Sequence, residues 1–178
     1  PAVGRRGFCY IPSASRLRLS AASRSLHSRI AAQLAVHDIT RKYNAIVWNP
    51  FSVESGTVDA PLARSRKDRK KVAIDQSGRR AVTHYRVLKN FKQFAHVECQ
   101  LETGRTHQIR VHMSSIGHPL LGDDVYGSGK SPYNITGQAL HARVLGFVHP
   151  RTGKYMEFEA PLPDYFQKIL NDLESNGR

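Results

Sequence analysis

Two pairs of short alternating segments restrict the fold of this chain more than any other feature of its sequence. In residues 81–88 and 94–101 apolar and polar side chains alternate, and β-branched and aromatic residues are frequent, which is typical of half-buried strands. Residues 89–93 form a short link between them, so an antiparallel hairpin is predicted. Residues 140–150 and 155–160 also read as strands, joined by a second short turn. Together with the helices expected below, these strands predict an α+β domain.

One further strand and two helices are expected around these strands. Residues 41–49 read RKYNAIVWN, with apolar side chains on both faces, which indicates a strand buried on both sides. Residues 25–37 carry apolar side chains at helical spacing and predict a short amphipathic helix. Residues 164–173 predict a closing helix that Asp164 can cap. Its inner face would comprise Phe166, Ile169, Leu170 and Leu173. Residues 56–71 are predicted to be mostly loop.

The segment LETGRTHQIRVHMSSIGHPLLGDDVYG, residues 101–127, carries the most information. Thr106 is predicted to cap a helix of about ten residues, because Gly117 suits the left-handed position after a helix end and Pro119 prevents continuation. The predicted buried stripe of this helix comprises Ile109, Met113 and Ile116. Arg110 would point about 100° away from the stripe, at the margin of the core. Its guanidinium could there meet a buried carboxylate or a phosphate.

The histidines and cysteines do not form a metal-binding or disulfide pattern. Four of the nine histidines are close together in this part of the sequence: His107, His112, His118 and His141. No two of these four are spaced i, i+4 and no H-E-x-x-H motif occurs, so structural roles are predicted for them and no metal. Cys9 and Cys99 are far apart in the sequence, which favours two reduced thiols over a disulfide.

The charge of the chain is large and unevenly distributed. The formal net charge is +13, and residues 1–93 hold 19 Lys and Arg against 5 Asp and Glu. Residues 94–178 hold 8 against 9. This asymmetry predicts a surface that faces a polyanion. Nucleic acid is favoured over an anionic membrane, because no basic amphipathic helix with a wide apolar face occurs. No apolar run approaches the roughly 18 residues that span a bilayer.

One short segment concentrates the positive charge. Residues 64–71 contain six cations and one acid. The cations are Arg64, Arg66, Lys67, Arg69, Lys70 and Lys71. Two interpretations remain open: a solvated charge run, or a loop that follows RNA phosphates, which Lys and Arg bind without base contacts. The net charge of the surrounding sequence favours the second.

Several motifs resemble the RluA-type RNA pseudouridine synthases in the order of that family. The segment of residues 101–127 resembles its C-terminal signature, and ITRKYNAIVW resembles its tyrosine strand. GTVDAPLAR, GRRAVTHYRVL and QALHARVLGFVHPRTGKYMEFEAPLPDYF resemble its middle and closing parts, so the resemblance covers roughly residues 25–173. It implies an α+β fold with a mixed, mostly antiparallel sheet flanked by helices and loops. It also implies isomerisation of uridine to pseudouridine in structured ribosomal or transfer RNA, without a metal or organic cofactor.

Three residues match functional positions of that family. Tyr43 matches its active-site tyrosine, which stacks on the target base; the alternative is an ordinary buried strand tyrosine. Arg110 matches the arginine that pairs with the catalytic aspartate and keeps it ionised; the alternative is a helix-surface cation. Leu140 matches the wall of the uracil pocket, with a core leucine as the alternative. We expect Tyr43 and Arg110 to face one shared pocket.

The sequence departs from the family where the nucleophile is expected. The family's aspartate precedes the tyrosine by about thirty residues, and that carboxylate attacks the substrate. Residues 8–16 of this chain read FCYIPSASR, and no acid precedes Asp38. With its partner absent, Arg110 is expected to be solvated or turned toward a phosphate. The chain alone is expected to be inactive.

The expected organisation follows from this departure. Residues 25–178 are expected to be the C-terminal part of a catalytic domain whose N-terminal half is missing. Residues 1–24 would be an arginine- and serine-rich arm, disordered or foreign to the fold. Three explanations remain open: a truncated or frameshifted fragment, which we favour, a missing half supplied by another chain, or a non-catalytic RNA-binding relative. A cytoplasmic location is expected, with a mitochondrial one as the alternative because residues 1–24 could be a transit peptide.

Overall fold

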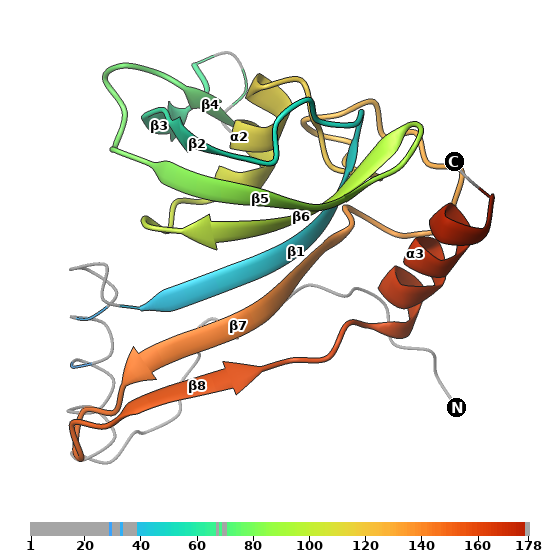
Figure 1. The fold of residues 1–178 in the computed structure, drawn as a ribbon. Helices are drawn as coiled ribbons and strands as arrows, with labels where there is room; N and C mark the ends of the chain where they lie inside the picture. Colours follow the sequence, from blue (N-terminus) through green and yellow to red (C-terminus); the bar gives the residue numbers. More distant parts are fainter. Residues whose placement is uncertain (1–28, 30–32, 34–38, 67, 69–70, 177–178) are drawn as a thin grey trace, which may run out of the picture.

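The fold is built on one six-stranded antiparallel sheet, which contains both predicted strand pairs. The computed structural model describes residues 29, 33, 39–66, 68 and 71–176. Its strands are β1 (Thr40–Trp48), β2 (Ser55–Asp59), β3 (Leu62–Arg64), β4 (Val72–Ile74), β5 (Val82–Asn90), β6 (Phe94–Leu101), β7 (Leu140–Val148) and β8 (Tyr155–Glu159). Its helices are α2 (Gln108–Ser115) and α3 (Asp164–Asn176). Six strands form a sheet in the order β2-β5-β6-β1-β7-β8, and β3 pairs with β4 in a separate small sheet (Figure 1). The predicted α+β class is confirmed.

Strand β1 lies inside the sheet and is buried on both faces. It pairs antiparallel with β6 and β7. Ala45, Ile46 and Val47 have no exposed surface. Because successive side chains of a strand point to opposite faces, Ala45 and Val47 contribute to one core and Ile46 to another. The prediction of a strand with two apolar faces is confirmed.

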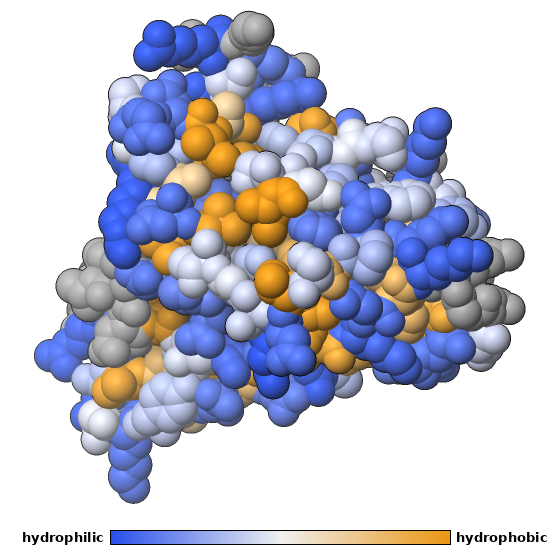
Figure 2. Space-filling view, turned by 45° about the horizontal axis from the view of Figure 1, so that its top comes forward, coloured by the Kyte–Doolittle hydropathy of each residue, from blue (hydrophilic) through white to orange (hydrophobic). Residues whose placement is uncertain are grey.

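The two helices cover opposite faces of this sheet. Ile109 and Met113 of α2 pack into the core that contains Ala45 and Val47. Phe166, Ile169, Leu170 and Leu173 of α3, the inner face predicted from the sequence, pack into the core that contains Ile46. Each helix therefore has its own core, and β1 separates the two. The face in Figure 2 is mostly hydrophilic, with groups of apolar residues between hydrophilic ones.

Both predicted hairpins form, but residues 56–71 contain more structure than the sequence indicates. Strands β5 and β6 are antiparallel neighbours, as are β7 and β8. The prediction of a loop over residues 56–71 is wrong in part, because β2 pairs with β5 and β3 pairs with β4. The partner strands are distant in sequence or very short, so their pairing leaves little local signal. Gly56 is needed on β2, since a Cβ there would lie 2.5 Å from the Tyr85 hydroxyl.

The limits of helix α2 are partly as predicted. Gly117 has φ 86°, and the His118 amide donates to the Met113 carbonyl at 2.9 Å, so the helix ends in the glycine motif that the sequence indicates. The start is different: His107, in the left-handed conformation with φ 56°, precedes the first helical residue, and Thr106 is not the cap. Ile116 is 37% exposed and does not belong to the buried stripe.

Two predictions concern the first part of the chain. The helix expected over residues 25–37 and the arm of residues 1–24 lie outside the described residues, except Arg29 and Gln33, which are helical. The Gln33 carboxamide exchanges two hydrogen bonds with the backbone of Val148 at 2.7 and 3.1 Å, so this point of the chain contacts the end of β7. No helix among the described residues is both long and apolar enough to cross a membrane.

Candidate functional site

Arg110 and Asp123 form a buried ion pair between helix α2 and the turn that follows it. The two carboxylate oxygens of Asp123 accept hydrogen bonds from Nε and Nη2 of Arg110, both at 2.7 Å. Asp123 also accepts the amides of Val125 and Tyr126 at 3.0 Å, and the guanidinium lies over the Tyr126 ring at 5.0 Å. Arg110 is 8% exposed and Asp123 is 1% exposed. Such a bidentate contact fixes the orientation of the guanidinium.

The electrostatics of this pair keep both partners charged. The hydrogen bonds that Arg110 donates to Asp123 raise the pKa of Arg110. Burial alone would raise the pKa of Asp123, but the Arg110 guanidinium and the two amides outweigh burial and bring that pKa below its ordinary value. Burial and the neighbouring Arg110 charge lower the pKa of His107, whose Nδ1 lies 2.8 Å from the Tyr126 hydroxyl. His107 is therefore a neutral neighbour of a charged pair at pH 7.

The expectation that Arg110 is solvated or turned toward a phosphate is wrong. Its carboxylate partner, Asp123, lies 13 positions further along the chain. Helical spacing places Arg110 at the margin of the core, as predicted, but it does not reveal that the following turn folds back over the helix. The alternative that Arg110 is an exposed cation on the helix surface is also wrong, because Arg110 is buried against Asp123.

Tyr43 and Leu140 lie on the side of the sheet that α2 covers. Tyr43 shares a strand face with Ala45, and both Tyr43 and Leu140 pack at the edge of the core formed by Ile109 and Met113. Tyr43 and Arg110 are thus on the same side of the sheet. Their roles, the uracil-pocket role of Leu140 and the shared pocket remain predictions.

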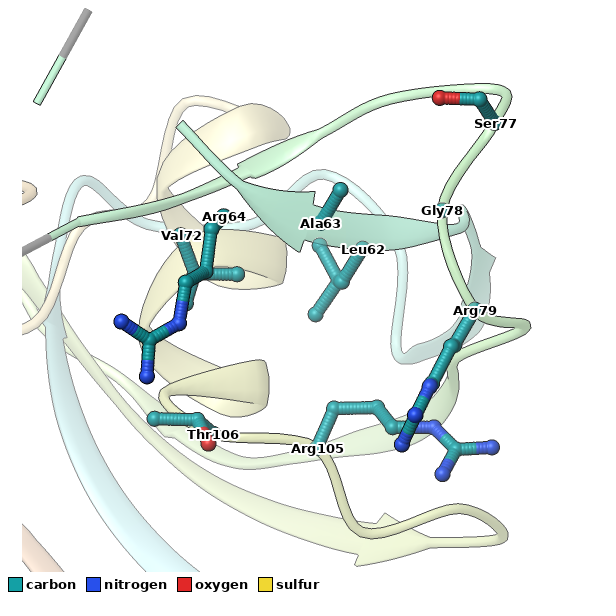
Figure 3. Close-up of a pocket in the computed structure, with 9 residues that line it drawn as sticks. All are labelled: Leu62, Ala63, Arg64, Val72, Ser77, Gly78, Arg79, Arg105 and Thr106. Carbon is teal, nitrogen blue, oxygen red and sulfur yellow. The ribbon is translucent and has the colours of Figure 1, made fainter. Parts of the chain in front are cut away.

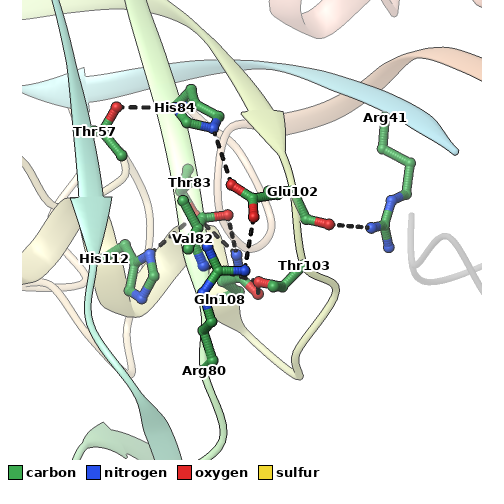
Figure 4. Close-up of polar contacts among 10 residues, drawn as sticks. All are labelled: Arg41, Thr57, Arg80, Val82, Thr83, His84, Glu102, Thr103, Gln108 and His112. Atoms are coloured by element: carbon green, nitrogen blue, oxygen red, sulfur yellow. Dashed lines mark hydrogen bonds and ion pairs between the residues drawn. The ribbon is translucent and has the colours of Figure 1, made fainter. Parts of the chain in front are cut away.

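A polar network that the sequence did not reveal connects the start of α2 to β5 (Figure 4). Gln108 is buried, and its Oε1 accepts hydrogen bonds from the Thr103 hydroxyl at 2.8 Å and the Arg105 amide at 2.9 Å. Its Nε2 donates to the Val82 carbonyl at 2.8 Å and the Thr83 hydroxyl at 3.0 Å. This one side chain therefore ties the first turn of α2 to β5 and to the segment before the helix. The only sign of this network in the sequence is the polar residue Gln108 at a position that packs inward.

The four histidines lie in different environments. His112 is buried between the Thr83 hydroxyl and the Ala60 carbonyl, and burial lowers its pKa. His118 stacks on Phe51 with ring centroids 3.5 Å apart, and His141 lies 3.3 Å from the Ala160 carbonyl. His107 contacts the Tyr126 hydroxyl, so each of the four histidines has its own partners, which supports structural roles. Across the described part of the chain, no three His, Cys, Asp or Glu side chains are grouped to hold a metal ion.

The basic segment is only partly described. Lys67, Arg69 and Lys70 lie outside the described residues. Arg66 is exposed and lies 3.8 Å from Asp75, whereas the Lys71 ammonium donates to the Val125 carbonyl at 3.3 Å. Lys71 is therefore held by the protein. Whether the segment binds RNA remains a prediction.

A basic cavity lies beside this segment, and three arginines line it. It has a volume of about 440 Å³ and is bounded by β3, residues 77–79 and residues 105–106 (Figure 3). Arg64, Arg79 and Arg105 line it together with apolar side chains, and no acidic residue does. Of these arginines, only Arg64 belongs to the basic segment of residues 64–71. Arg79 and Arg105 lie outside that segment, and only the fold brings the three together.

Known proteins resemble the chain in both sequence and fold. Residues 17–115 match the RNA pseudouridylate synthase family model. The chain is 51% identical over 163 residues to an uncharacterized RNA pseudouridine synthase, YlyB, of Bacillus subtilis, covering 92% of this chain and 54% of that protein. It is 50% identical over 161 residues to the ribosomal large subunit pseudouridine synthase D of Zymomonas mobilis, covering 85% of this chain and 50% of that protein. The chain thus spans about half the length of these curated relatives.

Solved structures agree with this assignment at the level of the fold. The human RNA pseudouridylate synthase domain containing 1 superposes with a TM-score of 0.69 at 23% identity, over 88% of this chain and 73% of that one. The human RNA pseudouridylate synthase domain containing 4 superposes with a TM-score of 0.68 at 25% identity, over 85% and 68%. Both show a shared architecture. Together with the family model, which matches more than half of the sequence, they lead to one conclusion: the chain belongs to the RNA pseudouridylate synthase family.

Proposed function

We propose that this chain functions in the isomerisation of uridine to pseudouridine in structured RNA, either ribosomal or transfer RNA. Family membership supports the reaction class, and the relatives at about 50% identity include a protein named for the ribosomal large subunit. The observation that carries the proposal is geometric. Tyr43 and Arg110 match the family's base-stacking tyrosine and aspartate-binding arginine, and they lie on the same side of the sheet, which α2 covers.

Each residue has a distinct part in this proposal. Tyr43 would stack on a uracil turned out of its helix, because an aromatic ring at the edge of an apolar core offers such a base a flat partner. Asp123 occupies Nε and Nη2 of Arg110, which leaves Nη1 outside the bidentate contact. That nitrogen would hold the nucleophilic carboxylate ionised. Asp123 itself accepts four hydrogen bonds and is buried, so it is not the nucleophile.

The carboxylate that attacks the substrate is expected from another segment. Residues 8–16, where the family pattern would place it, contain no acid and lie outside the described residues. We therefore expect the purified chain to release no tritium from RNA labelled at C5 of uridine, since only the isomerisation exchanges that hydrogen. Adding the part of the Bacillus subtilis relative that this chain does not match should restore release. Replacement of Arg110 by alanine should abolish the rescue.

Two results would contradict this proposal. Tritium release by the chain alone would show that another residue acts as nucleophile. Rescue that is unaffected by replacing both Tyr43 and Arg110 would show that neither residue serves the reaction. A matched control is Arg86→Ala, which removes an exposed arginine of β5 paired with Glu98 and should leave the rescue unchanged.

A non-catalytic RNA-binding protein is the second candidate, and one observation favours it. The Arg110 guanidinium already has a complete bidentate partner in Asp123, so the pair is stable without a second carboxylate. In that case RNA would bind but rescue would fail.

Both candidates require RNA binding that depends on phosphates. Neutralising Arg66, Lys67, Lys70 and Lys71 should weaken binding to all RNAs alike and reduce its salt dependence, because each lost phosphate contact lowers the slope by about 0.7–0.9. Fluorescence anisotropy titrations at several salt concentrations measure both quantities. Neutralising four exposed cations of the C-terminal half, Lys130, Arg151, Lys154 and Lys168, is the control and should have little effect. Equal effects in both variants would show that the segment is only a solvated charge run.

A further inference from the structure

The described arginines differ in whether a carboxylate neutralises them. Five have an ion-pair partner: Arg66, Arg80, Arg86, Arg110 and Arg143. The other six described arginines have no described carboxylate within ion-pair distance, and three of them, Arg64, Arg79 and Arg105, line the cavity between β3, residues 77–79 and residues 105–106. Arg29, Arg41 and Arg151 do not line it. Half of the unneutralised arginines thus share one concave place, where their charges repel one another until an anion binds.

The protein backbone holds these arginines in place. Arg79 and Leu62 exchange two backbone hydrogen bonds, each 2.9 Å long, which tie the turn to β3. A Cβ at Gly78 would lie 2.5 Å from the Leu62 carbonyl carbon, so only glycine allows this close approach. The Nε of Arg105 donates to the Arg80 carbonyl at 3.0 Å. The cavity is thus preorganised, in contrast to a set of mobile surface lysines.

The shape and lining of the cavity suit a nucleotide unit. A volume of about 440 Å³ lies within the range of about 300–1,000 Å³ found for small-molecule sites. Leu62 and Val72 provide an apolar wall, while the side chains in Figure 3 place guanidinium groups on both sides of the opening. A planar guanidinium donates two parallel hydrogen bonds to a phosphate, which is why arginine is preferred where phosphates are recognised.

The positive charge continues from this cavity toward Tyr43. Arg41 lies on β1 two positions before Tyr43, and its guanidinium packs against the backbone of Gly104, next to Arg105. Its Nη2 donates to the Glu102 carbonyl at 3.4 Å (Figure 4). Its Nε is buried and has no hydrogen-bond partner among the described residues, which is costly unless an acceptor arrives. The arginines thus mark a path from the cavity to the strand that carries Tyr43.

We propose that Arg64, Arg79 and Arg105 bind a backbone phosphate of RNA in this cavity, and that the bound RNA chain continues past Arg41 toward Tyr43. The inference rests on the proposed function, since it specifies where its RNA substrate is held. It adds an RNA-binding site that shares only Arg64 with the basic segment of residues 64–71. The contact would be independent of base sequence, because phosphates are the same at every position.

The test is RNA binding by the full chain, measured by fluorescence anisotropy with a labelled RNA stem-loop at several salt concentrations. Arg79→Gln and Arg105→Gln should each weaken binding roughly threefold to tenfold and lower the slope of log Kd against log salt by about one unit. Arg79→Lys should recover most of the loss. Arg86→Gln changes the net charge equally but removes an arginine that Glu98 already neutralises, so both affinity and slope should stay close to those of the unmodified chain.

The outcomes separate this inference from the proposed function. If the unmodified chain binds RNA and both cavity variants bind with unchanged slope, the cavity site is wrong while the proposed function stands. If the unmodified chain does not bind RNA, the proposed function fails as well. Uridine monophosphate that competes as strongly as the stem-loop would overturn the assignment to an RNA backbone, because it would indicate a site for a free nucleotide. Thermal melting shows that each variant is folded, and Arg105→Lys replaces Arg105→Gln if the latter is not.

Discussion

At the scale of single residues, Arg110 meets a buried carboxylate, which is one of the two partners that helical spacing left open. Helical spacing placed its guanidinium at the margin of the core, and the family resemblance assigned it a carboxylate from a segment ahead of Tyr43. The structure supplies Asp123 instead, from the turn after the helix. The pair is almost completely buried, and a buried charge that loses its partner is strongly destabilising.

We expect Asp123→Asn to lower the free energy of unfolding by about 3–5 kcal/mol, because it leaves the Arg110 charge buried without a counter-charge. Urea denaturation followed by circular dichroism measures this change. The double variant R110M/D123N should be no less stable than D123N alone, since the uncompensated charge has gone. A loss below about 1 kcal/mol in D123N would show that the pair contributes only as much as an exposed ion pair.

The same pair predicts a pH dependence. The pKa of Asp123 is lower in the folded protein than its ordinary value, so its contribution to stability is complete above an unfolded pKa of about 3.9 and is lost as the pH falls through the folded pKa. The difference in stability between the unmodified chain and D123N should therefore shrink below about pH 4. Urea titrations at pH 3 and pH 7 provide the comparison. A difference that does not depend on pH would contradict this assignment.

At the scale of elements, helix α2 shows which boundary signals are local. Its end was predicted, because Gly117 and Pro119 act through their own backbone geometry. Its start was not, because no capping side chain marks it and the Gln108 side chain is held by Thr103, Val82 and Thr83, which are distant in sequence or outside the helix. The first turn of α2 thus depends on strand β5.

We expect Gln108→Leu to destabilise the protein by at least about 2 kcal/mol, because it removes four hydrogen bonds and leaves buried polar partners unsatisfied, at about 1–3 kcal/mol for each. Chemical denaturation measures the effect. Gln100→Leu, at an exposed position of β6, is the matched control and should stay within about 0.5 kcal/mol of the unmodified chain. Equal stabilities of the two variants would show that the network does not hold the helix.

Gly117 allows a test of the helix end by itself. A Cβ at this position would meet nothing within 4 Å, so the cost of a side chain arises only from the positive φ of 86°. We expect Gly117→Ala to cost about 1–2 kcal/mol and Gly117→Asn less, because asparagine tolerates the left-handed region better. Thermal unfolding ranks the three proteins. An alanine variant as stable as the unmodified chain would mean that the helix end relaxes without strain.

At the scale of the whole molecule, the central sheet separates two cores that should respond independently to substitution. Ile109 belongs to the α2 core and Ile169 to the α3 core, on opposite faces of β1. Ile109→Val and Ile169→Val should each cost about 0.5–1.5 kcal/mol. The double variant should show the sum to within about 0.5 kcal/mol, because distant sites without shared partners are additive. A larger deviation in urea denaturation would show that the two faces are coupled through the sheet.

The sequence by itself determined strands β1, β5, β6, β7 and β8, the hairpins and the inner face of α3. These depend on alternation with period two or on helical spacing, and both patterns are confined to a few neighbouring residues. It also marked Tyr43 and Arg110 as candidate site residues, through motifs that lie within single segments. Residues 56–71 show the limit, since the partners of β2 and β3 could not be found from a short and mostly polar stretch.

Only the tertiary structure decided which charges meet. It joined Arg110 to Asp123 and Gln108 to β5, and it left Arg64, Arg79 and Arg105 around one cavity without a carboxylate. The physical reason is that an ion pair, a polar network or a cavity depends on distances between segments, set by how strands pair and how loops fold back. Local propensity contains no information about those distances, so the arginines of this chain look alike in the sequence and have different partners in the fold.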